Sequence, residues 1–134
     1  MLVGKFLGRG QFRNVYVLLS DPTKVVKIEE REQSFSNIKE WEFWQDNKDN
    51  PMIAKWLAPC HYISPSGAVL IQSRCYMVED KKLPKMLPSF LTDTKYQNFG
   101  MLNGKVVCFD YATVVNNLNT KLRNTKWFGD REID

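Results

Sequence analysis

Short apolar runs separated by turn residues occupy the first 28 residues, and they constrain the fold more than any other feature. Three such runs lie between Val3 and Ile28, rich in the β-branched and aromatic residues that favour strands. Asp21-Pro22, between the second and third runs, has the composition of a tight turn. Three successive strands joined by tight turns form an antiparallel meander, so the chain is expected to begin with an antiparallel sheet.

The spacing of apolar residues changes after this meander and becomes helical. The apolar positions with this spacing are Ile38, Trp41 and Trp44. Ser34 or Ser36 is suited to cap the start of the helix, and Pro51 should stop it. We therefore expect one helix packed on the sheet, which makes the chain an α+β protein.

Two further segments have the composition of hairpins. Residues 60–64 and 68–72 flank Pro65-Ser66-Gly67, which brings the expected sheet to about five strands. Residues 98–102 and 105–109 flank Asn103-Gly104, a strong signal for a two-residue turn. Residues 81–88 should be a charged connector. From Val115 onward we expect one irregular helix and then a tail that is either packed by Trp127 and Phe128 or frayed.

Size and composition fit one domain of 134 residues, 43% of them apolar, with a net charge of +4. No apolar run approaches the roughly 20 residues that span a bilayer, and no secretion signal is evident, so we expect a cytosolic protein without a membrane partner. The three cysteines have no metal-ligand spacing and should be reduced thiols. The single histidine, His61, should be structural and leaves no Ser-His-Asp triad. The basic residues are spread along the chain, which favours a solvated surface over a nucleic-acid partner.

Three local features point to phosphate chemistry, and each has an ordinary alternative. Gly8 and Gly10 lie between two expected strands, where glycines let backbone N–H groups approach phosphate oxygens, or they simply belong to a hairpin. Lys27 lies within an apolar strand and either meets an anion or points outward from the sheet. Glu40 shares a helix face with Phe43 and Trp44, so it should turn inward and could pair with Lys27, whereas Glu42 should be solvated.

A fourth feature connects these three. Asp93, Lys95 and Asn98 fit the pattern Asp-x-Lys-x-x-Asn, and Asp110 follows after the second hairpin in Asp110-Tyr111-Ala112. In this order the motifs resemble those of the eukaryotic-type protein kinase superfamily, including its aminoglycoside- and choline-kinase-like relatives. The glycine segment is similar to the pattern Gly-x-Gly-x-Phe-x-x-Val of that family. The residues that match it are Gly8, Gly10, Phe12 and Val15.

The resemblance covers about residues 4–112. It extends to short kinase-like proteins of bacterial viruses, which are similar in Asn37-x-x-Glu40-x-x-x-Trp44 and in Leu57-Ala58-Pro59. It implies a single domain with a kinase-like N-lobe over residues 1–73. Residues 74–134 would form a strongly truncated C-lobe that carries a catalytic-loop hairpin.

The resemblance also implies roles for individual residues, with ATP and Mg²⁺ as cofactors. Residues 8–12 would cover the phosphates, and Lys27, held by Glu40, would bind the α- and β-phosphates. Asn98 and Asp110 would hold Mg²⁺, whose preferred ligands are oxygens. The catalytic pair would be Asp93, which orients the acceptor hydroxyl, and Lys95, which steadies the γ-phosphate. Adenine would lie near residues 73–75.

Departures from the family pattern leave two function classes open. Leu91-Thr92 replaces the usual His-Arg, Ala112 replaces glycine, and no Ala-Pro-Glu motif follows. The substrate lobe is therefore missing, which weakens the case for peptide phosphorylation more than the case for ATP binding. One class is an ATP-Mg²⁺-dependent phosphotransferase. The other is a catalytically inactive kinase-like binding protein, such as a viral factor in the host cytoplasm. A host protein would be its target, or the substrate in the first class.

Overall fold

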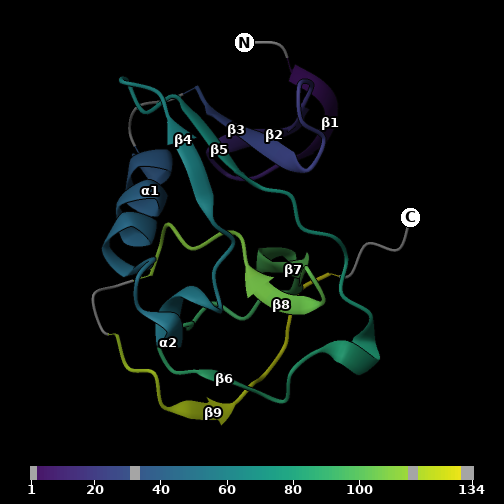
Figure 1. Cartoon of the computed structure of the whole chain (residues 1–134). Helices are drawn as coiled ribbons and strands as arrows, with labels where there is room; N and C mark the ends of the chain where they lie inside the picture. Colours follow the sequence, from purple (N-terminus) through teal and green to yellow (C-terminus); the bar gives the residue numbers. More distant parts are fainter. Residues whose placement is uncertain (1–2, 31–33, 115–117, 131–134) are drawn as a thin grey trace.

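A computed structural model describes residues 3–30, 34–114 and 118–130 of the chain. Its largest element is a five-stranded antiparallel sheet with the strand order β1-β2-β3-β5-β4 (Figure 1). The strands are β1 (Val3–Arg9), β2 (Arg13–Leu18), β3 (Lys24–Glu29), β4 (Cys60–Ile63) and β5 (Val69–Ser73). The sheet has the predicted number of strands, and together with one long helix it confirms the α+β class.

The register between β2 and β3 fixes which side chains share a face. Val15 pairs with Lys27 and Val17 with Val25, so these four side chains lie on one face of the sheet. Val17 and Val25 are buried. This register places Lys27 beside buried valines on the inner face, and not, as its alternative had it, pointing outward.

Helix α1 (Ser36–Asn47) lies alongside β4, and the short helix α2 (Pro51–Ala54) follows it (Figure 1). No serine side chain caps α1, so this prediction was wrong. Instead the carboxylate of Glu29 accepts hydrogen bonds from the backbone N–H groups of Ser36, at 3.1 Å, and Asn37, at 2.9 Å. A carboxylate satisfies two N–H groups at once and interacts favourably with the positive end of the helix dipole, which a serine hydroxyl does not.

Both predicted hairpins are present. The turn between β4 and β5 contains Gly67 with φ +80°. Strands β7 (Phe99–Leu102) and β8 (Lys105–Cys108) form a separate two-stranded sheet. Asn103 and Gly104 connect them, with φ angles of +52° and +80°, as a turn with two left-handed residues requires.

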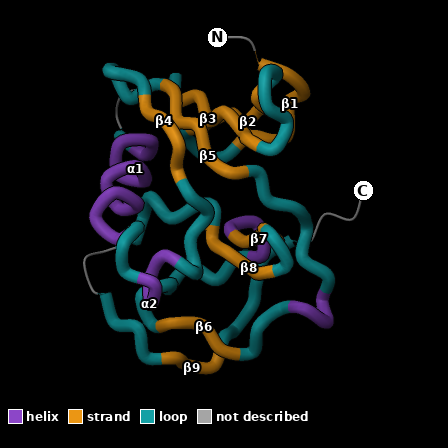
Figure 2. The backbone as a smooth tube through the Cα atoms, viewed as in Figure 1, coloured by secondary structure: helices purple, strands orange, loops and turns teal. Residues whose placement is uncertain are grey.

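The C-terminal part differs from the prediction. Residues 81–88, expected to be a connector, begin within the 3-10 turn η1 (Asp80–Lys82) and end in strand β6 (Met86–Pro88). Strand β9 (Leu122–Asn124) pairs with β6, and the described residues 118–130 contain no helix (Figure 2). Residues 115–117 lie outside the described residues. The segment satisfies its backbone groups against residues 88–90 rather than internally, through Ser89 N–H to Lys121 C=O and Phe90 N–H to Asn119 C=O.

The tail beyond β9 packs as expected at Trp127 but not at Phe128. The indole of Trp127 stacks on Tyr96, with 5.8 Å between ring centroids, and meets the edge of Phe99 at 4.9 Å. The side chain of Phe128 is 47% exposed. Its backbone instead pairs with the loop at residues 94–96.

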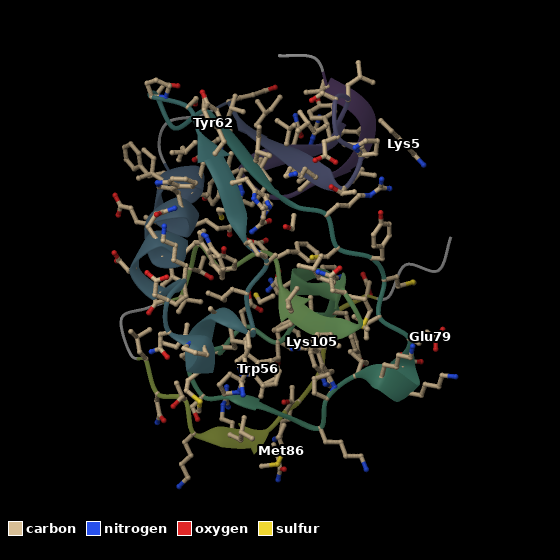
Figure 3. The ribbon with its side chains drawn as sticks, in the orientation of Figure 1. Lys5, Trp56, Tyr62, Glu79, Met86 and Lys105 are labelled. Atoms are coloured by element: carbon tan, nitrogen blue, oxygen red, sulfur yellow. The ribbon has the colours of Figure 1, made fainter. Side chains whose placement is uncertain are left out.

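One hydrophobic core joins the upper sheet to the lower part of the molecule. Phe43 and Leu70 belong to the same buried cluster as Phe90, Phe99 and Tyr111. Figure 3 shows Tyr62 on the upper sheet, with Trp56, Lys105 and Met86 in the lower part. Within the described residues, no helix has the length and apolarity that crossing a membrane requires.

Candidate functional site

Six of the predicted site residues meet at a cleft of about 570 Å³ between the inner face of the sheet and the two ends of the β7–β8 hairpin. The predicted residues that line it are Gly8, Gly10, Val15, Lys27, Asn98 and Asp110. Residues 73–75, the expected adenine position, line it too. Phe12 does not line this cleft: it is exposed and lines the neighbouring hollow beside Gln11 and Glu30.

Lys27 and Glu40 form the predicted pair. The Nζ of Lys27 lies 2.6 Å from Oε1 of Glu40, and both side chains are almost completely buried. Lys27 also donates to the backbone carbonyl of Phe109, at the end of the hairpin. Glu42, in contrast, is exposed, so the helix face was assigned correctly.

Glu40 is the centre of a buried hydrogen-bond network. Besides Lys27, its carboxylate accepts from Arg13, at 3.0 and 3.4 Å, and from the backbone N–H of Tyr111, at 2.8 Å. Burial alone raises the pKa of Glu40, but Lys27 and Arg13 outweigh it, so the pKa lies below the usual value of 4.5. The carboxylate therefore stays ionised at neutral pH and ties α1 to the segment after β8.

Two buried side chains complete this network. The amide of Asn37 donates to the carbonyls of Lys27 and Gly67, each at 3.0 Å, and its oxygen accepts from Arg13 at 3.2 Å. The hydroxyl of Tyr111 donates to Ala58 C=O at 2.7 Å. Asn37 thus fixes the backbone of β3 at Lys27, and Tyr111 fixes the segment after β8 against Ala58.

Asn98 and Asp110 have the donor chemistry of a site for a hard cation. They line the same cleft, and the backbone N–H of Phe109 donates to Asn98 C=O at 2.8 Å, which joins their segments. Among the described residues, no three His, Cys, Asp or Glu side chains gather closely enough to enclose a metal. Mg²⁺ commonly binds one or two protein carboxylates together with substrate phosphates, so this pair fits a cation shared with a phosphate group.

The expected catalytic residues, Asp93 and Lys95, do not line the cleft. Asp93 is half-buried, and its backbone carbonyl accepts from the side-chain amide of Asn98 at 3.3 Å. Lys95 is exposed, and its backbone pairs with Phe128. Both residues are therefore joined to Asn98 through their backbone carbonyls, because Lys95 C=O accepts a hydrogen bond from the backbone N–H of Asn98 at 3.0 Å.

Residues 73–77 form the outer wall of the cleft. Gly100 on β7 lies so close to them that an added Cβ would be 2.6 Å from Cβ of Cys75 and 3.0 Å from Tyr76 C=O. Burial raises the pKa of the Cys75 thiol to about 11, so it is protonated at neutral pH. His61 lies on β4 and its Nε2 is 2.8 Å from Oγ of Ser73, in keeping with a structural role.

Arg13 is the main site residue that was not predicted. It lies between Phe12 and Val15 of the glycine segment, at a position where the pattern specifies no residue type. The alternation of β2 carries a signal that could have found it: Arg13, Val15 and Val17 occupy alternate positions and so share the inner face. An arginine on a buried strand face requires a carboxylate partner.

No protein-family model matches the chain, and a search of curated proteins returns no match either. Function therefore has to be inferred from the residues of the cleft.

Proposed function

We propose that this chain is an ATP- and Mg²⁺-dependent phosphotransferase with a minimal protein-kinase-like fold. The observation that carries the proposal is the buried Lys27–Glu40 pair at the wall of a cleft that also contains Gly8, Asn98 and Asp110. A buried lysine whose ammonium is oriented by a carboxylate is a suitable ligand for phosphate oxygens. The carboxylate of Asp110 and the amide oxygen of Asn98 in the same cleft supply ligands for the Mg²⁺ that would accompany the phosphates.

The glycine segment supports this proposal because its glycines are not explained by the fold itself. Neither Gly8 nor Gly10 has a positive φ, and an added Cβ would meet nothing within 4 Å at Gly8. At Gly10 the nearest atom would be Arg13 C=O at 3.8 Å. An ordinary tight turn needs glycine because φ is positive or because a Cβ would clash, and neither condition holds at these two positions. Open space in front of the backbone instead suits a ligand such as a phosphate that approaches the chain closely, above all at Gly8, because the N–H of Gly10 already donates to Arg13 C=O at 2.8 Å.

Each residue of the cleft then has a chemical task. Lys27 binds phosphate oxygens, and Glu40 keeps its ammonium in place. Asn98 and Asp110 hold Mg²⁺, which neutralises charge that develops on the transferred phosphoryl group. Adenine lies against the wall at residues 73–75. A host protein is the macromolecular partner that we propose, as substrate, in the cytoplasm.

In this proposal Asp93 orients the acceptor hydroxyl and accepts its proton, and Lys95 steadies the γ-phosphate. Both belong to the loop that precedes Asn98, and the bond between Asn98 and Asp93 C=O couples that loop to the cleft. For these roles a bound nucleotide has to extend beyond the cleft lining to reach these two side chains. Residues 1–73 would serve as the N-lobe and residues 74–134 as the reduced C-lobe.

A second candidate function is a catalytically inactive kinase-like protein that binds and inhibits a host protein. The position of Asp93 and Lys95 outside the cleft lining favours it, because a general base has to reach the proton that it accepts. This candidate retains the cleft but requires no chemistry from the loop.

A comparison of two aspartate variants separates the candidates. In the enzyme, Asp93→Ala should bind ATP like the wild type but lower the rate of phosphate transfer by roughly 10²–10⁴-fold, because it removes the general base. Asp49→Ala, an exposed aspartate after α1, should change neither. Transfer of the γ-phosphate to the protein itself, to host proteins or to water is the quantity to measure.

The outcomes assign the function. Wild-type protein that binds ATP without transferring phosphate would support the binding protein, and its effect on a host should then survive Asp93→Ala. An equally active Asp93→Ala variant would mean that the catalytic loop is misassigned.

A further inference from the structure

Arg13 connects three parts of the cleft through one side chain. The residue lies at the start of β2, and only 8% of its side chain is exposed. One terminal nitrogen, Nη1, donates to Glu40 at 3.0 Å and to Asn37 at 3.2 Å. The other, Nη2, lies 3.4 Å from Glu40 and 2.9 Å from Oδ1 of Asp110. The planar guanidinium is thus shared between α1 and the segment after β8.

The two carboxylates differ in how much they depend on Arg13. Glu40 is fully buried and has Lys27 as a second cation, at 2.6 Å. Asp110 is 47% exposed toward the cleft, and among the residues that the structure describes only Arg13 forms an ion pair with it. The four side chains together carry two positive and two negative charges, so Arg13 balances Asp110 while Lys27 balances Glu40.

A divalent cation at Asp110 would have to approach this guanidinium. A ligand oxygen lies roughly 2.0–2.6 Å from Mg²⁺ or Ca²⁺, so a cation on the carboxylate would be near the positive Nη2. Arg13 cannot retreat easily, because Glu40 and Asn37 hold its other N–H groups. The attraction of Asp110 to Arg13 and its attraction to a metal therefore oppose each other.

We propose that Arg13 competes with the divalent cation for Asp110 and so sets the metal concentration that the cleft requires. This inference rests on the proposed function, in which Asp110 is the metal-binding carboxylate. Arg13 is a positioning residue here: it acts on the metal through Asp110. Weakening the Arg13–Asp110 bond should make the carboxylate more available to the cation.

The test is a titration with Mn²⁺ in the absence of nucleotide, with free Mn²⁺ followed by electron paramagnetic resonance. Arg13→Lys keeps a positive charge for Glu40 but has no planar fork to reach both carboxylates, and Arg13→Gln removes the charge. Arg9→Gln is the matched control, because Arg9 also lines the cleft but donates to Asn14. It removes the same charge without touching Asp110.

Both Arg13 variants should bind Mn²⁺ with a dissociation constant about tenfold lower than that of the wild type, from the loss of one charge-assisted hydrogen bond. Adding Asp110→Asn to Arg13→Lys should abolish the gain. Equal affinity of wild type and Arg13 variants, or an equal gain in Arg9→Gln, would overturn the proposal.

The wild-type protein gives a second measurement that does not depend on how the variants fold. Saturating Mg²⁺ should change the NMR resonances of the Arg13 guanidinium, and unchanged resonances would contradict competition. Neither measurement includes nucleotide, so a failure of ATP to bind would refute the proposed function without affecting the result at Arg13.

Discussion

A single buried carboxylate, Glu40, determines how the candidate site is held together. It accepts hydrogen bonds from Lys27, from Arg13 and from the backbone of Tyr111, which belong to β3, β2 and the segment after β8. A fully buried charge is costly unless it is paired and its remaining lone pairs are satisfied. Glu40 meets both conditions, so the network should be sensitive to the loss of any member.

Glu40→Ala should destabilise the protein by about 3–5 kcal/mol, because it leaves two cations buried without their carboxylate. Glu42→Ala is the matched control, two residues along the same helix and exposed, and should change the stability by less than about 0.5 kcal/mol. Denaturant unfolding of the three proteins measures both values. Similar losses in the two variants would argue against the central position of Glu40.

The same carboxylate makes stability depend on pH in the acid range. Because the pKa of Glu40 is lower in the folded protein than its usual value of 4.5, its contribution is complete above pH 4.5. It is lost as the pH falls below 4.5 toward the lower folded-state pKa, where the folded protein must also take up the proton. In Glu40→Gln, the unfolding free energy should change less with pH over this range than it does in the wild type. If Glu40→Gln and the wild type showed the same pH dependence, the pKa shift of Glu40 would be contradicted.

At the residue scale the sequence correctly predicts that Glu40 pairs with Lys27, but it does not predict the contacts of Arg13. Helical spacing with Phe43 and Trp44 is a local signal, and it places Glu40 on the inner face without knowledge of the rest of the fold. The role of Arg13 depends on Asp110, 97 residues later in the chain. Only the folded arrangement brings that pair together.

The elements around the cleft are positioned by a close approach of β7 to residues 73–77. Gly100→Ala should displace that wall, because the new Cβ would overlap Cβ of Cys75 and crowd Tyr76 C=O. We expect a loss of stability of about 1–3 kcal/mol and weaker ATP binding. Thermal unfolding and calorimetry measure the two effects.

Gly104→Ala is the control for this substitution. Gly104 has φ +80° in the hairpin turn, and its Cβ would meet nothing within 4 Å. The Gly104→Ala substitution should lower the stability by about 1 kcal/mol through backbone strain. It should leave the affinity for ATP unchanged. Unaltered ATP binding in Gly100→Ala would mean that residues 73–77 do not contact the nucleotide.

Elements with local signals were predictable, and elements that depend on distant partners were not. The turn at Asn103-Gly104 and the short β-branched runs of β2 and β3 are encoded within a few residues. Strands β6 and β9 have three residues each and pair across more than thirty residues, so neither shows a period of its own. The cap of α1 was missed for a similar reason, since Glu29 lies on the preceding strand.

At the scale of the whole molecule, the cleft lies where the five-stranded sheet meets the β7–β8 hairpin (Figure 1). The hydrophobic core is continuous across this junction, and the polar network of Glu40 and Arg13 lies at its edge. The cleft walls are therefore joined both by apolar packing and by ion pairs. Such a site is assembled before ligand arrives, which reduces the entropic cost of binding.

Calorimetric titration of ATP with Mg²⁺ tests the central claim most directly, with wild type, Lys27→Met and Lys24→Met compared under the same conditions. Lys24 lies on the same strand and pairs with Asp21, so it controls for the loss of one charge. We expect the wild type and Lys24→Met to bind ATP equally, and Lys27→Met to bind about tenfold or more weakly, because it lacks the buried phosphate ligand. No heat of binding in the wild type, or equal affinity in all three proteins, would contradict a nucleotide site at this cleft.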